Sequence, residues 1–345
     1  MKGVIDCERH ILLTSLDQVT EHLEPAWVTR MNESEFRLPP PGPHAGVQVE
    51  GAPVLGGTDP AEVAASLDPD DGEVVLIPAQ GIVTSGWLNI ATATTFVRGV
   101  NDHVVAEWLD ADPRLRFAIV VAPHDPGQAA AEIRRLGDHP AAAAVCMPLM
   151  AINMGQVHYH PIYEAASELG LPVMVHPGGS EGNVVGPPVL GGVGPRTPEE
   201  TFSLLPQVAQ ANLSSLLFDG IFTRFPELQV IFAGFGFAWA PPVLWRADTE
   251  WRGLRVEVPW VAEPPSTYAA DHVKLVVDAA AELHPEFPSV VAMLPEGMLI
   301  YGSDAPYDDQ GVRGRLETEL SPESAEGVLR DNAKSCLRLG SLDRG

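Results

Sequence analysis

Short apolar runs alternate with helical spans through most of this 345-residue chain. Most of the runs are apolar at nearly every position, as expected for parallel strands that are covered on both faces. Several of the spans between them begin with proline or end with glycine, as helices do. Eight runs are predicted strands: Val4–Cys7, Val74–Pro78, Phe117–Ala122, Ala142–Met147, Val173–His176, Leu228–Ala233, His272–Val277 and Met298–Gly302.

Repeated βα units of this number predict an α/β fold with a closed parallel barrel, the (β/α)8 or TIM barrel. The predicted helices are Thr94–Leu109, Gly127–Leu136, Pro161–Gly170, Glu199–Phe218, Pro241–Trp251 and Pro322–Leu339. An open doubly wound sheet is the structural alternative. It would need a nucleotide crevice, and no Gly-x-Gly-x-x-Gly motif follows a predicted strand. We therefore expect one barrel domain over residues 1–345.

Residues 11–72 interrupt the regular pattern directly after the first strand and are rich in proline and glycine in two places. A loop of this length inside a compact domain is usually functional, for example as a cap that shapes a substrate pocket. A surface excursion without a role is the alternative. The composition of this insertion does not indicate its fold.

Charge and composition narrow the classes of partner. The formal net charge is −25, which disfavours nucleic acid and anionic membrane surfaces. No apolar run is long enough to span a bilayer, and the N-terminus enters a strand without an export signal, so we expect a cytoplasmic protein. The three cysteines, Cys7, Cys146 and Cys336, have no regular spacing, which argues against a disulfide framework.

The first strand carries a group of ionisable residues. Simple alternation along an extended chain puts Asp6, Glu8 and His10 on one face. The same alternation puts Cys7 and Arg9 on the other face. We therefore expect Glu8 and His10 to point together at the tip of this strand.

Two more strand tips carry matching groups, His176 after the fifth apolar run and Asp304 after the eighth. A barrel places strand one beside strand eight and strand five across the lumen, so Glu8, His10, His176 and Asp304 can converge at the C-terminal face. Each has an ordinary interpretation alone; Asp304, for instance, could cap a turn. Together, two imidazoles and two carboxylates suit one divalent ion, with Zn²⁺ expected and Mn²⁺ or Fe²⁺ as alternatives.

Such an ion would lower the pKa of a bound water from about 15.7 towards roughly 7, which generates a nucleophile for attack on a carbonyl carbon. Asp304 is the expected catalytic proton shuttle between that water and the leaving group. His158, just beyond strand four, is a second catalytic candidate as an acid, a base or a substrate ligand. The alternative for His158 is a surface histidine that precedes a helix.

Several motifs follow one another along nearly the whole chain: Ile5–His10, Pro161–Ala166, Val175–Gly178, Phe222–Leu228, Pro241–Arg246, Tyr301–Pro306 and Asp331–Ala333. In order and spacing they resemble the amidohydrolase superfamily, in the amidohydrolase-related branch that includes aminocarboxymuconate-semialdehyde decarboxylase and the hydroxybenzoate decarboxylases. The resemblance implies a distorted (β/α)8 barrel, one divalent metal held by Glu8, His10, His176 and Asp304, and a homodimer.

The sequence departs from this family at two positions. Decarboxylases of the branch usually carry a catalytic histidine at the tip of strand six, and Gly234 stands there in this chain. Tyr307 stands where the family often has a histidine after the last motif. No lysine lies on strand four, where binuclear members of the superfamily bridge two metals, so one metal is expected.

The expected function is a metal-dependent hydrolase that cleaves a C–N (amide-type) bond of a small-molecule or peptide-like substrate through a metal-activated water. This chemistry needs no histidine at Gly234. One alternative is a non-oxidative, metal-dependent decarboxylase of an aromatic or unsaturated carboxylic acid. A second alternative is an inactive barrel that acts as a binding protein. The four retained ligand residues weigh against it, since such groups are costly to bury without a metal.

Overall fold

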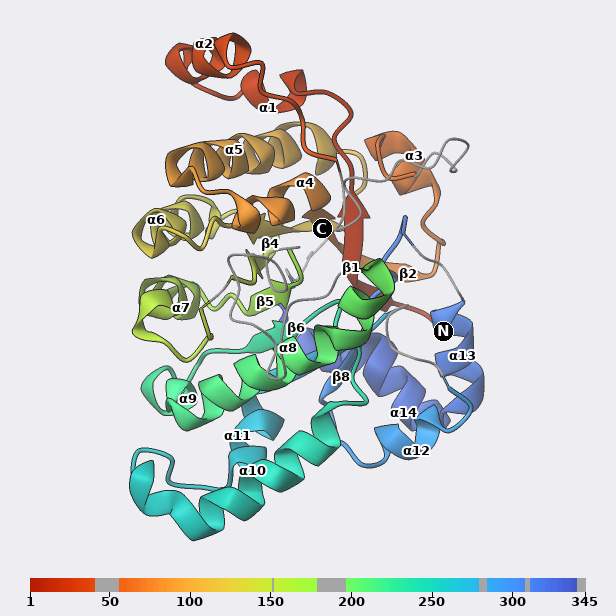
Figure 1. The fold of residues 1–345 in the computed structure, drawn as a ribbon. Helices are drawn as coiled ribbons and strands as arrows, with labels where there is room; N and C mark the ends of the chain where they lie inside the picture. The colour runs from red at the N-terminus through yellow and green to blue at the C-terminus, as the bar shows by residue number, and fades with distance from the viewer. Residues whose placement is uncertain (41–55, 151, 179–196, 279–283, 308–310, 340–345) are drawn as a thin grey trace.

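Eight parallel strands form one sheet whose order follows the chain from β1 to β8 (Figure 1). The computed structural model describes residues 1–40, 56–150, 152–178, 197–278, 284–307 and 311–339. The strands are β1 (Val4–Ile11), β2 (Asp71–Pro78), β3 (Leu115–Val120), β4 (Ala142–Pro148), β5 (Val173–His176), β6 (Val230–Phe232), β7 (Val273–Val277) and β8 (Leu299–Tyr301).

The seam between the first and last strands closes the barrel. Arg9 and Ala305 form a parallel bridge. On either side of it, the His10 amide donates to the Ala305 carbonyl at 2.7 Å, and the Asp304 amide donates to the Glu8 carbonyl at 2.9 Å. The predicted (β/α)8 barrel is therefore confirmed, and this seam lies next to the predicted site residues.

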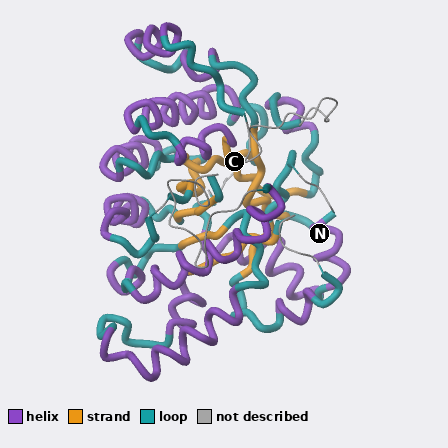
Figure 2. Tube along the Cα trace, in the orientation of Figure 1, coloured by secondary structure: helices purple, strands orange, loops and turns teal. Residues whose placement is uncertain are grey.

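Helices surround the strands on the outside (Figure 2). Single π-helical turns extend α5 at Val104–Trp108 and join α14 to α15 at Gly327–Asp331. The α-helices are α1 (Asp17–Thr20), α2 (Pro25–Glu33), α3 (Pro60–Ala65), α4 (Ala79–Ile82), α5 (Ile90–His103), α6 (Pro126–Leu136), α7 (His160–Glu168), α8 (Pro198–Phe218), α9 (Ile221–Arg224), α10 (Ala240–Leu254), α11 (Pro265–His272), α12 (Phe287–Val291), α13 (Val312–Glu319), α14 (Pro322–Glu326) and α15 (Asn332–Cys336).

Local sequence signals explain most helix starts. At α6, Pro126 occupies the first turn, and the Asp125 carboxylate accepts from the Gln128 amide at 3.1 Å. Both features suit the first turn of a helix, where backbone amides have no partner within the helix. Proline has no amide to leave unpaired, and the capping carboxylate accepts from one of the others. The closing helix predicted over 322–339 is observed from Pro322 to Cys336, as α14, a π-helical turn and α15 without a break, and it ends three residues earlier than predicted.

Apolar side chains fill both faces of the barrel wall. Along β5, Val173 and Val175 pack outward against the helices, while Met174 packs inward with the lumen residues of the other strands. The next inward position on this strand is His176. Alternation along a buried strand therefore delivers the histidine to the mouth of the lumen.

The C-terminal segment closes the opposite end of the lumen. Ala333, Cys336 and Leu337 join the lumen cluster. The Asn332 side chain donates to the Leu299 carbonyl at 2.7 Å, and the Arg338 amide donates to the Ala143 carbonyl at 3.2 Å. The last described residues thus form the floor of the barrel, which leaves the C-terminal face of the strands as its open end.

A bulge in β1 changes the face on which its residues lie. The pairing with β2 shifts between Asp6 and Arg9, where β1 contains one residue more than its partner. Cys7 packs with the lumen cluster and Glu8 also points to the lumen side, so the predicted opposition of these two residues was wrong. A bulge places two successive residues on one side of a strand. The Asp6 carboxylate accepts from the Glu8 and Ser303 amides at 3.1 and 2.9 Å and ties β1 to the segment after β8.

The described parts of the insertion contain α1, α2 and α3. Val19 at the end of α1 packs with Phe96 and Val100 of α5, outside the barrel wall (Figure 1). Residues 56–57 return to the site side, where the Leu12 amide donates to the Gly57 carbonyl at 2.8 Å. Residues 41–55 lie outside the described part of the chain. The role of the insertion as a cap stays a prediction.

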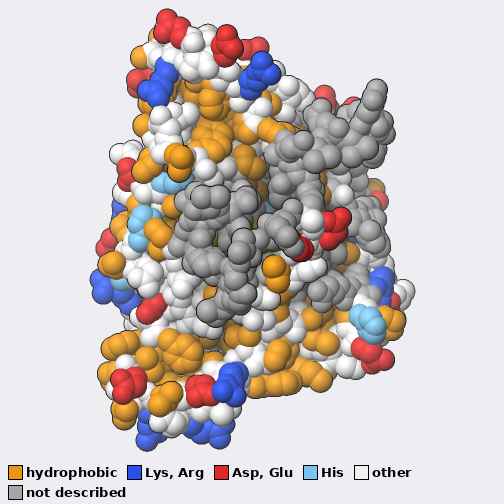
Figure 3. All heavy atoms as spheres, viewed as in Figure 1, with side chains coloured by type: hydrophobic (Ala, Val, Ile, Leu, Met, Phe, Trp, Pro, Cys, Tyr) orange, Lys and Arg blue, Asp and Glu red, His pale blue; other side chains and the backbone are white. Residues whose placement is uncertain are grey.

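Exposed apolar side chains gather on α10 and the segment that follows it, at the lower edge of the view in Figure 3. Trp245 and Leu254 are each about half exposed, and Val256 and Trp260 continue the patch.

Among the helices of the described residues, none combines the length and the apolar character that a membrane span requires.

Candidate metal centre

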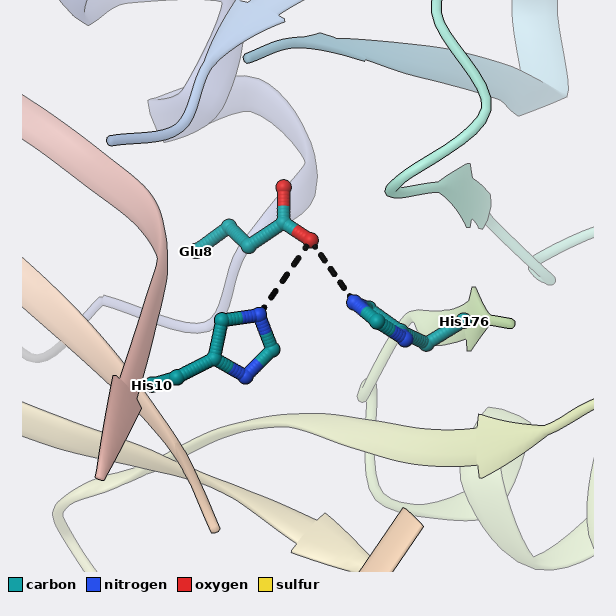
Figure 4. Close-up of side chains that lie close together, drawn as sticks. All are labelled: Glu8, His10 and His176. Atoms are coloured by element: carbon teal, nitrogen blue, oxygen red, sulfur yellow. Dashed lines mark ion pairs between the residues drawn. The ribbon is translucent and has the colours of Figure 1, made fainter. Parts of the chain in front are cut away.

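Three predicted ligands meet at the open end of the barrel (Figure 4). The Glu8 Oε1 atom lies 3.0 Å from His176 Nε2 and 3.8 Å from His10 Nε2. One donor atom from each residue lies within 4.8 Å of the others. The imidazole rings meet edge to face, with their centroids 5.0 Å apart. β1 and β5 therefore place two nitrogens and one carboxylate around a common point, as the tip positions predict.

Asp304 joins this group through His10. Its Oδ1 atom lies 3.3 Å from His10 Nε2, but its oxygens fall outside the set of donor atoms that lie within 4.8 Å of one another. Asp304 adopts a left-handed backbone conformation, with a φ of 52°. Such a conformation is uncommon for a residue with a side chain, although aspartate tolerates it better than most. Here it accompanies a carboxylate that reaches back to the seam.

Gly302 makes room for Glu8. A Cβ atom at this position would lie 2.7 Å from Glu8 Cβ, 3.1 Å from Glu8 Oε2 and 2.6 Å from Val276 Cγ1. Glu8 Cβ is held by the strand backbone and cannot move as the end of a flexible chain would. The absence of a side chain at Gly302 is therefore a condition for the observed position of Glu8.

We expect Gly302→Ala to lower the affinity for Mn²⁺ by about 10- to 100-fold, the range typical when the support of a ligand is disturbed. The measurement is titration of purified protein with Mn²⁺. Gly253→Ala is the matched control, because a Cβ there meets no atom within 4 Å. That control lies in α10, so it should keep full affinity and gain up to about 1 kcal/mol of helix stability. Equal affinities for the two variants would contradict the packing role of Gly302.

The site holds opposite charges away from water. Burial raises the pKa of Glu8, but hydrogen bonding and charge from His10 and His176 outweigh it and bring the pKa to about 2. Burial lowers the pKa of His10, yet its contacts with Asp304 and Glu8 raise it to about 9. The pKa of Asp304 is raised, chiefly by burial. Without a bound cation, the buried glutamate thus relies on protonated histidine for its charge balance.

The donor set fits a divalent cation. Glu8 is fully buried, and neither of its carboxylate oxygens has a hydrogen-bond partner of good geometry. His176 Nδ1 lies 2.7 Å from the Pro177 carbonyl, a contact in which the ring nitrogen donates. The Nε2 atom of the same ring then faces Glu8, on the side where a cation would bind. A buried carboxylate beside oriented imidazole nitrogens offers the types of ligand that Zn²⁺ and Mn²⁺ accept.

Asp278, immediately after β7, is a site residue that the sequence analysis missed. It is fully buried, and its Oδ2 atom accepts from the Gly234 amide at 3.0 Å. Burial raises its pKa well above the usual range, and the neighbouring carboxylates of Glu8 and Asp304 raise it further. An acidic residue directly after an apolar strand is the same signal that marked Asp304, so the sequence contained the information.

Gly234 lies beside the ligands without contributing a side chain. Its φ is 78°, and a Cβ there would lie 3.4 Å from His176 Nε2 and 3.0 Å from Pro177 Cδ. The backbone therefore approaches the histidine closely at the tip of β6. The structure places no ionisable side chain at this point, in agreement with the departure noted in the sequence.

His158 belongs to a different pair. Its Nε2 atom lies 2.8 Å from the Pro123 carbonyl, and the Nε2 atom of His124 lies 2.9 Å from the Ser85 carbonyl. The pKa of His124 is lowered by burial, and the nearby His158 lowers it further. In the described chain, His158 makes no hydrogen bond or ion pair with Glu8, His10 or His176. Its catalytic role stays a prediction.

Tyr307 packs against the ligands from the other side. Its ring meets that of His10 edge to face, with centroids 5.1 Å apart. Burial raises the pKa of its hydroxyl, and the Asp304 carboxylate adds to the shift. An aromatic ring therefore occupies the position where the family often has a histidine, and it shields one side of the His10 ring from water.

A parallel barrel with carboxylate and imidazole donors at the C-terminal ends of its strands defines a class of barrel enzymes that use metals. Comparison with known families agrees. The amidohydrolase model Amidohydro_2 matches residues 5–339, and the chain belongs to this family. The predicted family and the expectation of an enzyme are thereby confirmed. Among curated proteins, none matches the chain in sequence.

Solved structures share the whole fold. The 5-carboxyvanillate decarboxylase of Sphingomonas paucimobilis matches with a TM-score of 0.67 and 17% identity, over 98% of this chain and 99% of that one. A dihydroxybenzoic acid decarboxylase from Polaromonas, with bound manganese and 2-nitroresorcinol, gives 0.67 and 15% over 97% of both chains. An amidohydrolase from Mycobacterium avium subsp. paratuberculosis gives 0.68 and 16% over 98% and 99%. At such identities the likeness shows the fold.

Proposed function

We propose that this protein is a metal-dependent, non-oxidative decarboxylase of an aromatic or unsaturated carboxylic acid. The observation that carries the proposal is the fully buried Glu8 carboxylate, whose Oε1 atom faces the Nε2 atoms of His176 and His10 at 3.0 and 3.8 Å. Similar folds whose substrates are named act on dihydroxybenzoate and 5-carboxyvanillate. Their likeness favours decarboxylation over the hydrolysis expected from the sequence.

We propose one divalent ion, with Glu8, His10, His176 and Asp304 as its ligands. Manganese in three of the similar structures supports Mn²⁺, and the mixed nitrogen and oxygen donors suit Zn²⁺ equally well. When bound, the ion would supply positive charge for a substrate carboxylate and a neighbouring hydroxyl, and would stabilise negative charge as it develops.

The protein groups then have distinct tasks in the reaction. The bond between the ring carbon and the carboxylate breaks, CO₂ leaves, and the electron pair stays on the ring carbon. That carbon takes a proton to restore the ring. Asp304 is the proposed donor, because its carboxyl group lies 3.3 Å from His10 at the mouth of the site and its side chain is 25% exposed, which allows reprotonation from water.

Hydrolysis of an amide-type bond is the second candidate. Gly234 favours it, because a decarboxylase that relies on an acid at the tip of strand six has no such group here. In this version Asp304 takes a proton from the attacking water and returns it to the leaving nitrogen. The small-molecule substrate and the implied homodimer are further parts of the proposal.

A product assay separates the two candidates. Protein loaded with Mn²⁺ or Zn²⁺ is offered hydroxybenzoates, a carboxyvanillate and cyclic amides, and release of CO₂ and of amine is measured. We expect CO₂ with loss of the substrate carboxylate, and no activity after chelation. Amine release without CO₂ would instead establish hydrolysis, and a chain that binds no metal would contradict both.

Metal affinity should rise with pH. Since the pKa of His10 is raised to about 9, the metal-free site holds this imidazole protonated at neutral pH. A cation must displace that proton, so the apparent affinity should increase about tenfold per pH unit up to about pH 9. Mn²⁺ titration between pH 6 and pH 9 measures the slope. A flat profile would show that His10 is not a ligand.

A further inference from the structure

Asp278 has contacts that the fold does not require. It comes directly after Val276 and Val277 at the tip of β7, on the inward face that Val276 also occupies. It is fully buried, yet one of its two oxygens has no hydrogen-bond partner. A buried and half-unpaired acid is costly to retain unless it serves the surrounding groups.

On one side, Asp278 contacts the glutamate ligand. A Cβ atom added to Gly302 would lie 2.7 Å from Glu8 Cβ and 2.6 Å from Val276 Cγ1. Glu8 and Val276 of β7 are therefore direct neighbours. Two residues beyond Val276, the Asp278 carboxyl group lies near enough to the Glu8 carboxyl group for their charges to interact strongly. A displacement of Asp278 would therefore act directly on the position of Glu8.

On the other side, Asp278 reaches the histidine ligand through the backbone. Its Oδ2 atom accepts from the Gly234 amide at 3.0 Å. Gly234 is in the left-handed conformation, and its Cβ position lies 3.4 Å from His176 Nε2. The hydrogen bond thus fixes the turn against which the His176 ring rests.

We propose that Asp278 is a positioning residue of the metal centre, which sets the spacing between Glu8 and His176 by holding Glu8 directly and His176 through the Gly234 turn. This inference rests on the metal centre proposed above. Residues that orient ligands in this way typically change metal affinity by 10- to 100-fold when they are removed. Asp278 would thereby link strands one, five, six and seven at one point.

The test compares Asp278→Ala and Asp278→Asn in Mn²⁺ binding, measured from the electron paramagnetic resonance signal of the free ion. Asparagine keeps an oxygen for the Gly234 amide and offers an N–H to Glu8, so we expect its affinity within about threefold of the wild type. Alanine removes both contacts, and we expect a 10- to 100-fold loss. Where the alanine variant does not fold, Asp278→Ser replaces it, because serine is too short to span both partners.

Asn101→Ala is the matched control. Asn101 is also fully buried and pairs with the backbone of Val120, on the outer side of β3. It should lower the melting temperature without changing the affinity. Full affinity in folded Asp278→Ala would overturn the inference, and so would an equal loss in the asparagine variant, which would indicate direct ligation by the carboxylate. A wild-type protein that binds no Mn²⁺ would refute the metal centre itself.

Discussion

Replacing His176 by alanine is expected to lower Mn²⁺ affinity by more than about 100-fold and to abolish turnover. The loss should exceed that of any supporting residue, for which 100-fold is the usual upper range. His176 is the proposed ligand from the far side of the lumen, and its Nε2 atom lies 3.0 Å from Glu8 Oε1. Removing it leaves the buried Glu8 carboxylate with one imidazole instead of two.

His272→Ala provides the comparison for this variant. His272 is also partly buried, and its Nδ1 atom lies 2.9 Å from the Leu228 carbonyl. It is the last residue of α11, directly before β7, at the end of the barrel away from the site. Its substitution should leave Mn²⁺ affinity and turnover unchanged. Metal binding that survives in His176→Ala would exclude the proposed ligand set.

Asp304→Asn should lower kcat by about 10²- to 10⁴-fold at saturating metal, the range for loss of a positioned proton donor. Asparagine retains an oxygen that can face His10 Nε2 but cannot deliver a proton. A proton donor must be protonated before each turnover, so wild-type turnover should fall as the pH rises through the pKa of Asp304 in the metal-loaded protein. This alkaline limb should be absent from the residual activity of the variant.

Metal content must be determined beside each rate, because Asp304 is proposed both to bind the ion and to move the proton. A variant that recovers full turnover with excess Mn²⁺ would limit Asp304 to metal binding. Asp248→Asn is a suitable control, since Asp248 accepts from the Ser266 amide and hydroxyl on α10 and α11. It should keep both metal content and rate.

The barrel could be predicted from the sequence because its strands are buried on both faces. Runs such as Val173–Val175 are apolar at each position, and this pattern is independent of contacts elsewhere in the chain. The convergence of Glu8, His10 and His176 followed from topology, since a closed barrel fixes which strand tips meet. The first prediction relied on the local apolar pattern, and the second relied on the fixed order of strands in a closed barrel.

Features that depend on close contact could not be predicted in the same way. The bulge in β1 arises from its pairing with β2 and places Cys7 and Glu8 on the same side of the strand. The space that Gly302 leaves for Glu8 likewise depends on three strands, β1, β7 and β8. Asp278 differs, because its position after an apolar run was visible and was overlooked. The insertion was unreadable because its helices are short, and α1 and α2 pack on α5 through scattered residues.

The seam between β1 and β8 has a consequence for how this protein is made. Glu8 and Asp304 are joined by a backbone hydrogen bond across that seam, and the floor of the lumen comes from residues near 333–338. A nascent polypeptide therefore lacks an intact pocket for the proposed ion until Asp304 and the floor residues have left the ribosome. Metal binding would follow the synthesis of that floor, and removal of residues 333–338 would open the barrel from below while the four proposed ligands remained in place.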